Sequence, residues 1–518
     1  MKLRLFLSGF GLCLAIVALA LAGSAWAGIP SLPPPPAPPV WGPNIIANTD
    51  SSGYGQHEPN LAASFTNPNI VVAAAKDYRE GNIKHVWIYG STDGGQSWPT
   101  QLHMPGLPPD VPLQSDPVVV ARDDGRIFVL AIGYNQNNGL FLTWTDDGVN
   151  FVPSVPVIYG NGSLNDKPWL AIDNNPASPY YHRMYIAWAP GGVVNRYSTD
   201  GGLTWSASVP IPPSGNEYPY PVVTQNGDVF VFTMAPWGFC VNGSIYYAKS
   251  TNGGVSFGSA QAVVSTSQPC SPIHGGGGFD QWRFFSIISA VTNPLNNNEL
   301  YVAWTDDNNV TYGQTDVYYV RSTDHGVTWT PRIRLSHDPA GSGRDHITPV
   351  LFYGSNGRLH ALWMDRREDP ANQLFHTWYS SSTDMGETWE ADSRVSEVAQ
   401  NMNIGLPPGS GGAAGDYWGL WAVGDIVYTA WNDTRRNEQD IWTARGVFGA
   451  ATPTPTVAPT ITPSPTPTHP PTSVELTAFK GSSADEQSSS WSLLWLASII
   501  ALVSITWIVR QVARGRTP

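Results

Sequence analysis

Ser322-Thr323-Asp324-His325-Gly326-Val327-Thr328-Trp329 follows a pattern, Ser-x-Asp-x-Gly-x-Ser/Thr-aromatic, that recurs along this chain. The other copies are Ser91 to Trp98, Ser198 to Trp205, Ser250 to Phe257 and Ser382 to Trp389, with a degenerate copy from Trp144 to Phe151. The Asp (Asn in one copy) can accept hydrogen bonds from backbone N–H groups, the Gly can take a positive φ, and the aromatic ring can pack beneath the turn. Each copy therefore predicts a tight turn between two strands.

The spacing of these octapeptides indicates a repeat architecture. The acidic or amide positions are Asp93, Asp146, Asp200, Asn252, Asp324 and Asp384, which are 53, 54, 52, 72 and 60 residues apart. Periods of this size are typical of propellers and solenoids. Three apolar runs precede each turn, and seven units begin near Pro59, Pro117, Pro168, Pro221, Phe284, Pro349 and Tyr417.

These units predict an all-β propeller of four-stranded blades, with seven blades favoured and six as the alternative. The seventh unit ends near Gly446 without a fourth strand, and residues 44–47 form an apolar run that belongs to no unit. We expect residues 44–47 to pair with residues 440–446 and close the ring, because closure removes the free edges of the array.

The octapeptide resembles the Asp-box, or bacterial neuraminidase repeat, of the sialidase-like β-propellers. Sialidases of this family hold the substrate carboxylate with three arginines and use a Tyr nucleophile helped by a Glu, with an Asp as acid/base. Gly415-Asp416-Tyr417 resembles the place of the nucleophile. The early Arg-Ile/Leu-Pro motif is absent, since Gly28-Ile29-Pro30 has no arginine, and an arginine triad cannot be aligned.

The resemblance therefore leaves three functions open. One is a surface glycosidase of the exo-sialidase type, acting on extracellular glycans. The second is a non-catalytic propeller that binds a glycan or another surface ligand, and the third is a scaffold. A propeller can serve all three, so whether the chain is an enzyme is not decided by its fold.

In a propeller of this kind, the first strand of each blade is innermost and its N-terminal end opens on one mouth of the central channel. A carboxylate stands near the start of each predicted first strand: Glu58, Asp116, Asp166, Glu217, Asp280, Asp345 and Asp416. The loops between second and third strands reach the same mouth, whereas the Asp-boxes lie at the opposite end and are expected to be structural. Singly, such carboxylates cap strands or pair with arginines; together they could hold a hard cation such as Ca²⁺ or supply an acid/base pair for glycoside cleavage.

We predict a catalytic group of Asp345, Asp416 and Tyr417 at this mouth. The predicted substrate-binding residues are Glu58, Asp116, Asp166, Lys167, Asp280, Arg283, Arg344, Asp365, Arg367, Asp433 and Arg435. Asp365 and Asp433 belong to the sequences Trp-Met-Asp-Arg-Arg and Trp-Asn-Asp-Thr-Arg-Arg.

The two ends of the chain predict export and anchoring. Residues 1–27 have the charged start, apolar stretch and Ala-Trp-Ala site of a signal peptide. A Pro-rich lead-in at 28–42, the propeller at 43–450 and a Pro/Thr-rich stalk at 451–490 follow. Residues 491–509 are uncharged and long enough to cross a bilayer once, and the basic tail 510–518 is expected in the cytoplasm, with the propeller outside the cell.

The cysteine content predicts a disulfide, and the net charge and missing motifs narrow the range of partners and site types. Outside the predicted signal peptide only Cys240 and Cys270 occur, flanking the fourth Asp-box unit, and they predict a disulfide because exported proteins retain such bonds. The net charge of -13 disfavours nucleic acid as a partner. No zinc-type Cys/His spacing, phosphate-binding loop or Ser-His-Asp motif stands out.

Overall fold

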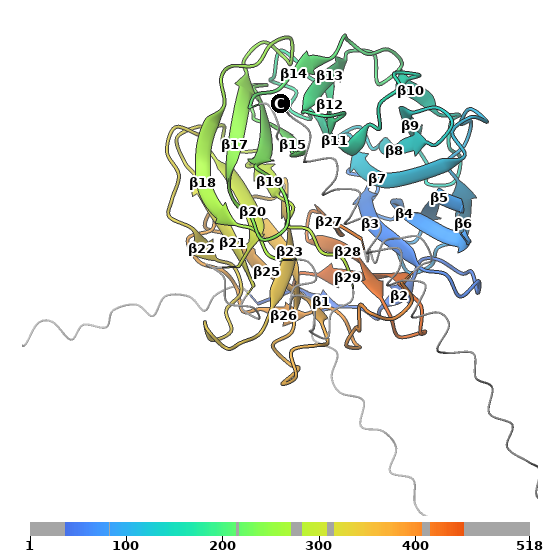
Figure 1. Ribbon diagram of the computed structural model, residues 1–518. Coiled ribbons are helices and arrows are strands. Elements are labelled where there is room, and N and C mark those ends of the chain that lie inside the picture. Colours follow the sequence, from blue (N-terminus) through green and yellow to red (C-terminus); the bar gives the residue numbers. More distant parts are fainter. Residues whose placement is uncertain are drawn as a thin grey trace, which may run out of the picture. The chain divides into compact units, whose positions relative to one another are not determined.

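The computed structural model describes residues 37–81, 83–213, 217–270, 282–307, 315–406 and 415–449. All regular elements in these ranges are β-strands, and they form seven antiparallel sheets arranged around a common centre (Figure 1). Neighbouring sheets contact one another around the ring, and the inner strand β27 of the last sheet contacts β3 of the first. The predicted seven-bladed propeller is confirmed, and the six-bladed alternative is wrong.

The inner two strands of each blade form hairpins. The innermost strands are β3 (Gln56–Ala63), β7 (Leu113–Ala121), β11 (Asp166–Ile172), β15 (Glu217–Val223), β19 (Ser289–Thr292), β23 (His346–Tyr353) and β27 (Gly419–Val423). The second strands are β4 (Val71–Glu80), β8 (Ile127–Tyr134), β12 (Met184–Ala189), β16 (Val229–Ala235), β20 (Leu300–Asp306), β24 (Leu359–Asp365) and β28 (Ile426–Asp433).

The outer two strands complete each blade. The third strands are β5 (Ile83–Ser91), β9 (Gly139–Thr145), β13 (Val194–Ser198), β17 (Asn242–Ser250), β21 (Asp316–Ser322), β25 (His376–Ser382) and β29 (Asp440–Val447). The outermost strands of blades 1 to 6 are β6 (Thr100–His103), β10 (Val155–Tyr159), β14 (Val209–Pro210), β18 (Gln261–Ser267), β22 (Ile333–Arg334) and β26 (Ser393–Arg394).

The seventh blade takes its outer edge from the beginning of the chain. Strands β1 (Val40–Trp41) and β2 (Ile45–Ile46) both pair antiparallel with β29, and Ile46 lies opposite Trp442. Asn48 extends this contact, because its amide donates to Asp440 at 2.8 Å and its carbonyl oxygen accepts the Ile441 N–H at 2.8 Å. The predicted closure by residues 44–47 is confirmed.

The Asp-box turns have the predicted hydrogen bonds. In the fifth blade, the Ser322 hydroxyl donates to Asp324 at 2.8 Å and accepts the Gly326 N–H at 2.9 Å, and Asp324 accepts the Thr328 N–H at 2.8 Å. Gly326 has φ +85°, and a Cβ there would lie 3.0 Å from the ring of Phe230 in the preceding blade. Each box therefore fixes its own hairpin and contacts a neighbouring blade.

The degenerate box is one residue shorter than the others, which changes its assignment. Asp147, not Asp146, takes the acceptor position: it receives the Thr145 hydroxyl at 3.0 Å and the Asn150 N–H at 2.8 Å. Asp146 instead pairs with the Arg126 guanidinium at 2.8 Å. The prediction that Asp146 is the box residue was wrong. It counts the residues back from the aromatic end of an eight-residue pattern, whereas this turn is one residue shorter.

Tryptophans on the second strands form a repeated part of the core. Trp188, Trp304, Trp363 and Trp431 are fully buried, one each on β12, β20, β24 and β28. In the last three blades the indole N–H donates to the Asp two residues later, at 2.8 to 3.2 Å. Because that Asp ends the second strand, the tryptophan positions the rim of the channel mouth.

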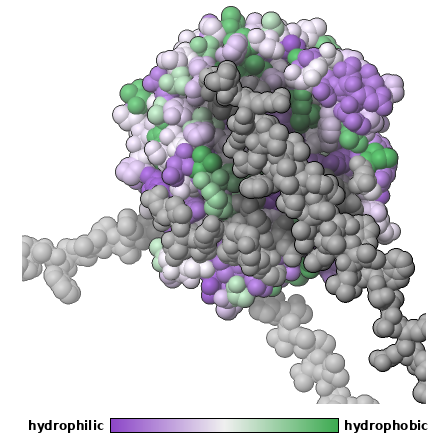
Figure 2. Space-filling view, viewed as in Figure 1, coloured by the Kyte–Doolittle hydropathy of each residue, from purple (hydrophilic) through white to green (hydrophobic). Residues whose placement is uncertain are grey.

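The described surface is largely hydrophilic. Outside the grey atoms, Figure 2 shows hydrophobic residues as small separate patches. Several exposed apolar side chains stand on the Asp-box turns, namely Leu203, Val255 and Val327. The described residues include no helix with the length and hydropathy needed to span a membrane. The predicted signal peptide at 1–27, the stalk at 451–490 and the membrane helix at 491–509 lie outside them.

Candidate functional site at the channel mouth

A backbone bulge shapes the mouth end of most inner strands. Five residues, each directly followed by a proline, have φ between 51° and 55°: Glu58, Asp116, Lys167, Tyr218 and Thr348. The pairing register shifts at each of these positions. A left-handed backbone is unfavourable for residues with a Cβ, and bulges re-aim side chains near functional sites. The repeated bulge therefore marks one structurally equivalent position in five blades.

This equivalence corrects the predicted ring of carboxylates. Only Glu58 and Asp116 occupy the bulge position, whereas Asp166 and Glu217 precede it by one residue and Asp345 by three. Glu58, Asp116, Asp166 and Glu217 lie within the inner strands and not before them. Adjacent residues of a strand point to opposite faces, so an offset of one residue changes what a side chain contacts. Asp280 lies outside the described residues.

A charged cluster joins the first, second, third and seventh blades at this mouth. The Lys167 ammonium contacts the carboxylates of both Asp116, at 3.4 Å, and Asp416. Arg283 reaches the other oxygen of Asp416 at 3.9 Å, and Lys76 approaches Glu58 at 3.8 Å. Four predicted substrate-binding residues are thus brought together with the predicted catalytic residue Asp416, namely Glu58, Asp116, Lys167 and Arg283.

The Ser115 hydroxyl connects two acidic groups of this cluster. It lies against Asp116 and 3.5 Å from the Glu58 carboxyl group. Both acids are almost completely buried, with 1% of Glu58 and 4% of Asp116 exposed. Gly415 makes room for Glu58, since a Cβ at Gly415 would lie 2.8 Å from the Glu58 backbone nitrogen.

The surroundings move the pKa values of these two acids in opposite directions. Burial raises the pKa of Glu58 to about 8, and the negative charge of Asp116 adds to this effect. Burial alone would also raise the pKa of Asp116, but Lys167 and Lys76 hold it below its ordinary value. The setting therefore favours the neutral form of Glu58 and the ionised form of Asp116.

The pKa of Lys167, the basic partner of these acids, is also shifted. Burial would lower the pKa of Lys167, but the carboxylates of Asp116 and Asp416 raise it well above its ordinary value. Lys167 consequently remains charged between the two carboxylates. A Ca²⁺ ion would have to displace this ammonium group to reach both of them, so the arrangement does not suit a calcium site.

Two further acids lie at the same rim in a less buried setting. Burial raises the pKa of Asp166, and burial together with the charge of Asp166 raises the pKa of Glu217 to about 7. Both side chains are only partly buried. Glu217 can therefore take up or release a proton near neutral pH at the entrance to the cluster.

Tyr417 lies beside this cluster but its hydroxyl group is engaged. It donates to the carbonyl oxygen of Pro117 at 3.0 Å, and the ring packs edge-on against Trp169 at 5.4 Å. Burial raises the pKa of Tyr417 well above its ordinary value, and the negative charge of Asp116 adds to this effect. This environment disfavours the phenolate that a tyrosine nucleophile requires.

Asp345 takes part in a different hydrogen-bond network. One of its oxygens accepts the backbone N–H and hydroxyl of Thr315, at 3.1 and 2.9 Å, and the other accepts Arg366 at 3.1 Å and Asn372 at 2.7 Å. The carboxylate is completely buried. Its neighbour Arg344 donates to the Gly343 carbonyl at 3.4 Å. These contacts suit a structural role for Asp345, because they join the segment before β23 to the loop that follows β24 and to the loop before β21.

The Trp-x-Asp-x-Arg segments form internal ion pairs at the rim. Arg367 donates to Asp365 at 2.8 Å, and Arg435 donates to Asp433 at 2.8 and 3.0 Å. Both aspartates are buried. Since each acid is already bonded to a tryptophan and an arginine, these segments hold the ends of β24 and β28, and their free capacity for a substrate is small.

Sequence reasoning did not identify two members of the cluster. Lys76 directly follows the apolar run Val71 to Ala75 within the same strand, which indicates a buried charge with a partner. Tyr218 occupies the bulge position before a proline, and the Lys167 ammonium lies 5.3 Å from its ring centre. The recurring residue-proline pair would have identified Tyr218.

A disulfide and an aromatic group lie at the mouth end of the fourth blade. Cys240 precedes β17 and Cys270 follows β18, and the structure joins them with their Cα atoms 4.4 Å apart. Phe239 stacks on Phe285 with ring centres 4.5 Å apart, and Arg283 lies 4.5 Å above Phe285. Phe239 is 40% exposed, so this aromatic surface is accessible beside the charged cluster.

Comparison with known proteins agrees with the repeat. The family model of the BNR/Asp-box repeat matches residues 196–207, within the third unit. The resemblance to Asp-box propellers is thereby confirmed at the level of the repeat and the fold. Among curated proteins, no sequence matches this chain.

Several solved structures match this chain at low identity and with a low TM-score. A protein of unknown function from Dyadobacter fermentans is 13% identical with a TM-score of 0.43, over 80% of this chain and 100% of its own. The leech intramolecular trans-sialidase is 12% identical with a TM-score of 0.42, over 62% and 67%. An alpha-L-arabinanase from Penicillium chrysogenum is 14% identical with a TM-score of 0.41, over 70% and 100%. Similarity at this level does not identify an activity.

Proposed function

We propose that this chain is an exported, membrane-anchored propeller whose channel mouth binds an extracellular glycan and cleaves a glycosidic bond. One arrangement carries the proposal: the buried acids Glu58 and Asp116 meet at the Ser115 hydroxyl, in a cluster that also holds Asp416 and Lys167 and that shifts the pKa values of the two acids in opposite directions. Paired acids with pKa values moved apart are the arrangement that acid/base catalysis requires.

The chemistry assigns different roles to the acids. A glycosidase needs one carboxylic acid that still carries its proton at neutral pH, to protonate the leaving oxygen, and Glu58 with a pKa of about 8 meets this condition. It also needs an ionised carboxylate to attack the sugar or to activate water. Asp416 takes that role, because Lys167 and Arg283 keep positive charge against it.

The proposed mechanism uses carboxylates and not the Tyr417 hydroxyl. That hydroxyl is donated to Pro117 and its pKa is raised, both of which oppose attack on a sugar. Lys167 and Arg283 would attract an anionic sugar, so sialosides remain part of the proposed substrate range together with neutral glycosides. Asp345 stays a prediction as a second catalytic residue, although its hydrogen bonds suit a structural role.

A second candidate is a glycan-binding propeller without catalysis. The exposed ring of Phe239, which is supported by the buried Phe285 stacked against it, favours this candidate because an exposed aromatic face can pack against the apolar face of a sugar. Binding at this surface does not require a proton donor. The two candidates therefore differ in their dependence on Glu58.

The experiment compares the purified parent with Glu58→Gln, Asp416→Asn and the matched control Glu217→Gln. Fluorogenic sialosides and neutral glycosides measure turnover, and a glycan array measures binding. The proposal expects turnover by the parent, a loss of at least about 100-fold in Glu58→Gln and Asp416→Asn, retained binding, and a smaller effect in Glu217→Gln. Glycan binding without turnover in any protein would favour the second candidate. A parent protein that shows neither glycan binding nor turnover would contradict both candidate functions.

A further inference from the structure

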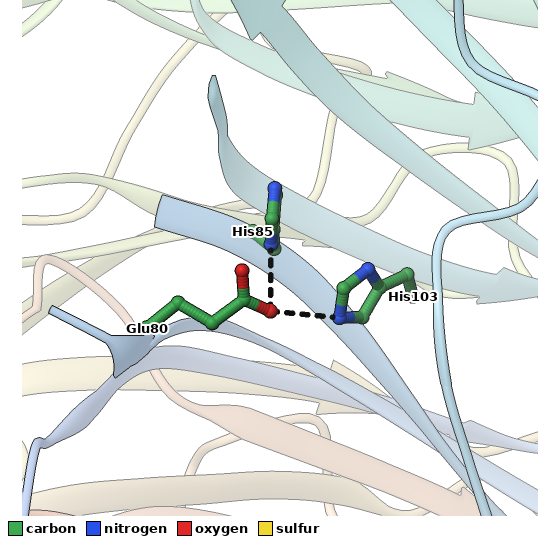
Figure 3. A group of neighbouring side chains, drawn as sticks. All are labelled: Glu80, His85 and His103. Atoms are coloured by element: carbon green, nitrogen blue, oxygen red, sulfur yellow. Dashed lines mark ion pairs between the residues drawn. The ribbon is translucent and has the colours of Figure 1, made fainter. Parts of the chain in front are cut away.

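Three side chains with metal-binding atoms meet at the mouth end of the first blade. A single oxygen of Glu80 lies 3.4 Å from Nδ1 of His85 and 3.3 Å from Nε2 of His103, as Figure 3 shows. The ligand atoms of all three lie within 4.8 Å of one another. This group shares no residue with the charged cluster at the channel mouth.

The strand register brings these residues together. His103 lies opposite Trp87 on the neighbouring strand, and His85 is two residues from Trp87, so both imidazoles stand on the same face of the sheet. The two rings are 4.6 Å apart. A register shift between Asp77 and Glu80, at the end of β4, brings the Glu80 carboxylate to that face.

We propose that Glu80, His85 and His103 bind one divalent transition-metal ion, with Zn²⁺ as the best-fitting ion. Zinc prefers imidazole nitrogen and carboxylate oxygen at about 2.0–2.2 Å in tetrahedral geometry, which places neighbouring ligand atoms roughly 3.3–3.5 Å apart. The two Glu80 distances fall in this range. Three protein ligands leave a fourth position for water or an external group.

The surroundings support ligation and not only an ion pair. The His103 ring rests edge-on against Trp87 at 4.3 Å, which orients it. The nearby Arg79 is bonded to Asp77 at 2.9 Å and stacks on Trp87, so its charge is partly compensated.

A second group with similar atoms, Asp338, His346 and Asp365, has a different character. Arg334 contacts Asp338 at 2.7 Å and Arg367 contacts Asp365 at 2.8 Å, so both carboxylates are already neutralised. In addition, the buried His346 ring lies 2.6 Å from Asp316, 3.3 Å from Asp338 and 3.2 Å from Asp365. A histidine enclosed by carboxylates that are themselves paired with arginines describes an ion-pair network, so of these two groups in the described residues, Glu80, His85 and His103 suit a metal ion better.

Binding would fasten the ends of three strands. Glu80 ends β4, His85 is near the start of β5 and His103 ends β6, and all three ends lie on the mouth side of the blade. An ion held between them would restrain the β4–β5 hairpin beside the proposed glycan site. Glu80 and His103 are each more than 40% exposed, so the ion can enter directly from solvent.

The test is calorimetric titration of the purified full-length chain with ZnCl₂, supported by the absorption spectrum with Co²⁺. The variants are His103→Gln and Glu80→Gln. The matched control is His182→Gln, because His182 also pairs with a carboxylate, Asp123 at 2.6 Å, but has no second histidine within that pair. Thermal melting without metal establishes that each variant is folded.

We expect one zinc ion bound by the parent and by His182→Gln. His103→Gln and Glu80→Gln should bind it at least about tenfold more weakly and lose the intense visible bands of tetrahedral Co²⁺. Equal stoichiometry and affinity in all four proteins would overturn the assignment, and so would the absence of zinc binding by the parent. Neither result depends on whether the chain cleaves glycosides.

Discussion

The carboxyl groups of Glu58 and Asp116 meet at the hydroxyl of Ser115, although they come from the same position of two neighbouring blades. A hydroxyl group has one proton to donate, and Asp116 is its closer acceptor. Glu58 can keep its own proton without leaving that hydroxyl unsatisfied. The repeat of the fold thus places two chemically similar acids in one small volume, and their different neighbours make one neutral and the other charged.

The first prediction concerns stability against pH. The pKa of Glu58 is about 8 in the folded chain against an ordinary value of 4.5, so between these pH values the folded state holds a proton that the unfolded state has lost. The free energy of unfolding should therefore fall as pH rises from 4.5 to 8 and then level off. Glu58→Gln cannot titrate and should remove this part of the slope.

Urea unfolding of the parent and of Glu58→Gln at pH 5, 6.5 and 8 measures the difference between their free energies of unfolding. Glu217→Gln is the comparison, because burial raises the pKa of Glu217 only to about 7 and its part of the slope should end there. A stability difference between parent and Glu58→Gln that does not change with pH would mean that Glu58 is ionised in the folded chain.

The second prediction concerns the Asp-box. Ser322→Ala removes the acceptor of the buried Gly326 N–H and one donor to Asp324, so it should lower the free energy of unfolding by about 1–3 kcal/mol. Asp324→Ala should also destabilise the turn. Neither variant should change glycan binding or turnover by the folded protein, because the box lies at the end of the blade opposite the mouth.

Val327→Ala is the control for this turn, since the Val327 side chain is 78% exposed and its loss should leave stability nearly unchanged. Chemical denaturation measures all three variants. A folded Ser322→Ala protein with full stability but altered ligand binding would contradict the structural assignment of the box.

A third prediction concerns ring closure. Asn48→Ala leaves the Ile441 N–H without its acceptor and removes a donor to Asp440, and should cost about 1–3 kcal/mol of stability. Burial already raises the pKa of Asp440 to about 7, and the Asn48 amide opposes this rise. The variant should therefore raise that pKa further and lose more stability at pH 8 than at pH 5.

Thermal melting at the two pH values tests this prediction, with the exposed Ser51→Ala as control. An unchanged melting temperature in Asn48→Ala would show that the strands β1 and β2 close the ring without help from this contact.

The fold was predictable from sequence because its signal is local and repeated. The octapeptide around Asp324 needs only its own residues to form a turn, and its recurrence counts the blades. The seventh blade has no such turn, but the apolar residues 44–47 had no partner in any unit, which indicated where the missing edge strand comes from. Only the shortened turn at Asp147 was misassigned, by one residue.

The candidate site was predicted less completely because it depends on register between distant strands. Asp416 and Lys167 are 249 residues apart, and no local pattern indicates that they touch. Asp166 and Lys167 look interchangeable in sequence, yet the bulge gives them different positions. The sequence predicts Asp345 as a catalytic acid but does not indicate its hydrogen bonds with Arg366 and Asn372, which suit a structural role. Likewise, nothing local connects Glu80 and His103, which meet through strand pairing.

The fourth prediction concerns placement at the cell surface. Residues 491–509 are uncharged and Arg510, Arg514 and Arg516 follow, which predicts a single helix with the tail in the cytoplasm. Protease added to intact cells should release the propeller by cutting the stalk at 451–490. A chain ending at residue 490 should appear in the medium without protease. Protection of the propeller until the cells are lysed would contradict this orientation.

The last prediction concerns the Lys167 ammonium group, which lies between two buried carboxylates. Its side chain is 13% exposed, whereas those of Asp116 and Asp416 are 5% and 0% exposed. Lys167→Met keeps most of the side-chain volume but removes the cation between the two carboxylates, which would keep only the more distant charges of Lys76 and Arg283. Breaking a buried ion pair in this way costs about 3–5 kcal/mol, whereas Arg126→Ala, which breaks the exposed pair with Asp146, should cost about 1 kcal/mol or less.

A double variant separates lost charge compensation from lost packing. Lys167→Met together with Asp416→Asn removes one of the two carboxylate charges, so it should be more stable than Lys167→Met alone, and the two changes should not be additive. Urea denaturation at pH 7 of the parent, both single variants and the double variant gives the coupling energy. If the two changes were additive, Lys167 would stabilise the mouth only through its packing against Tyr218, and the carboxylates of Asp116 and Asp416 would not depend on it for their charge.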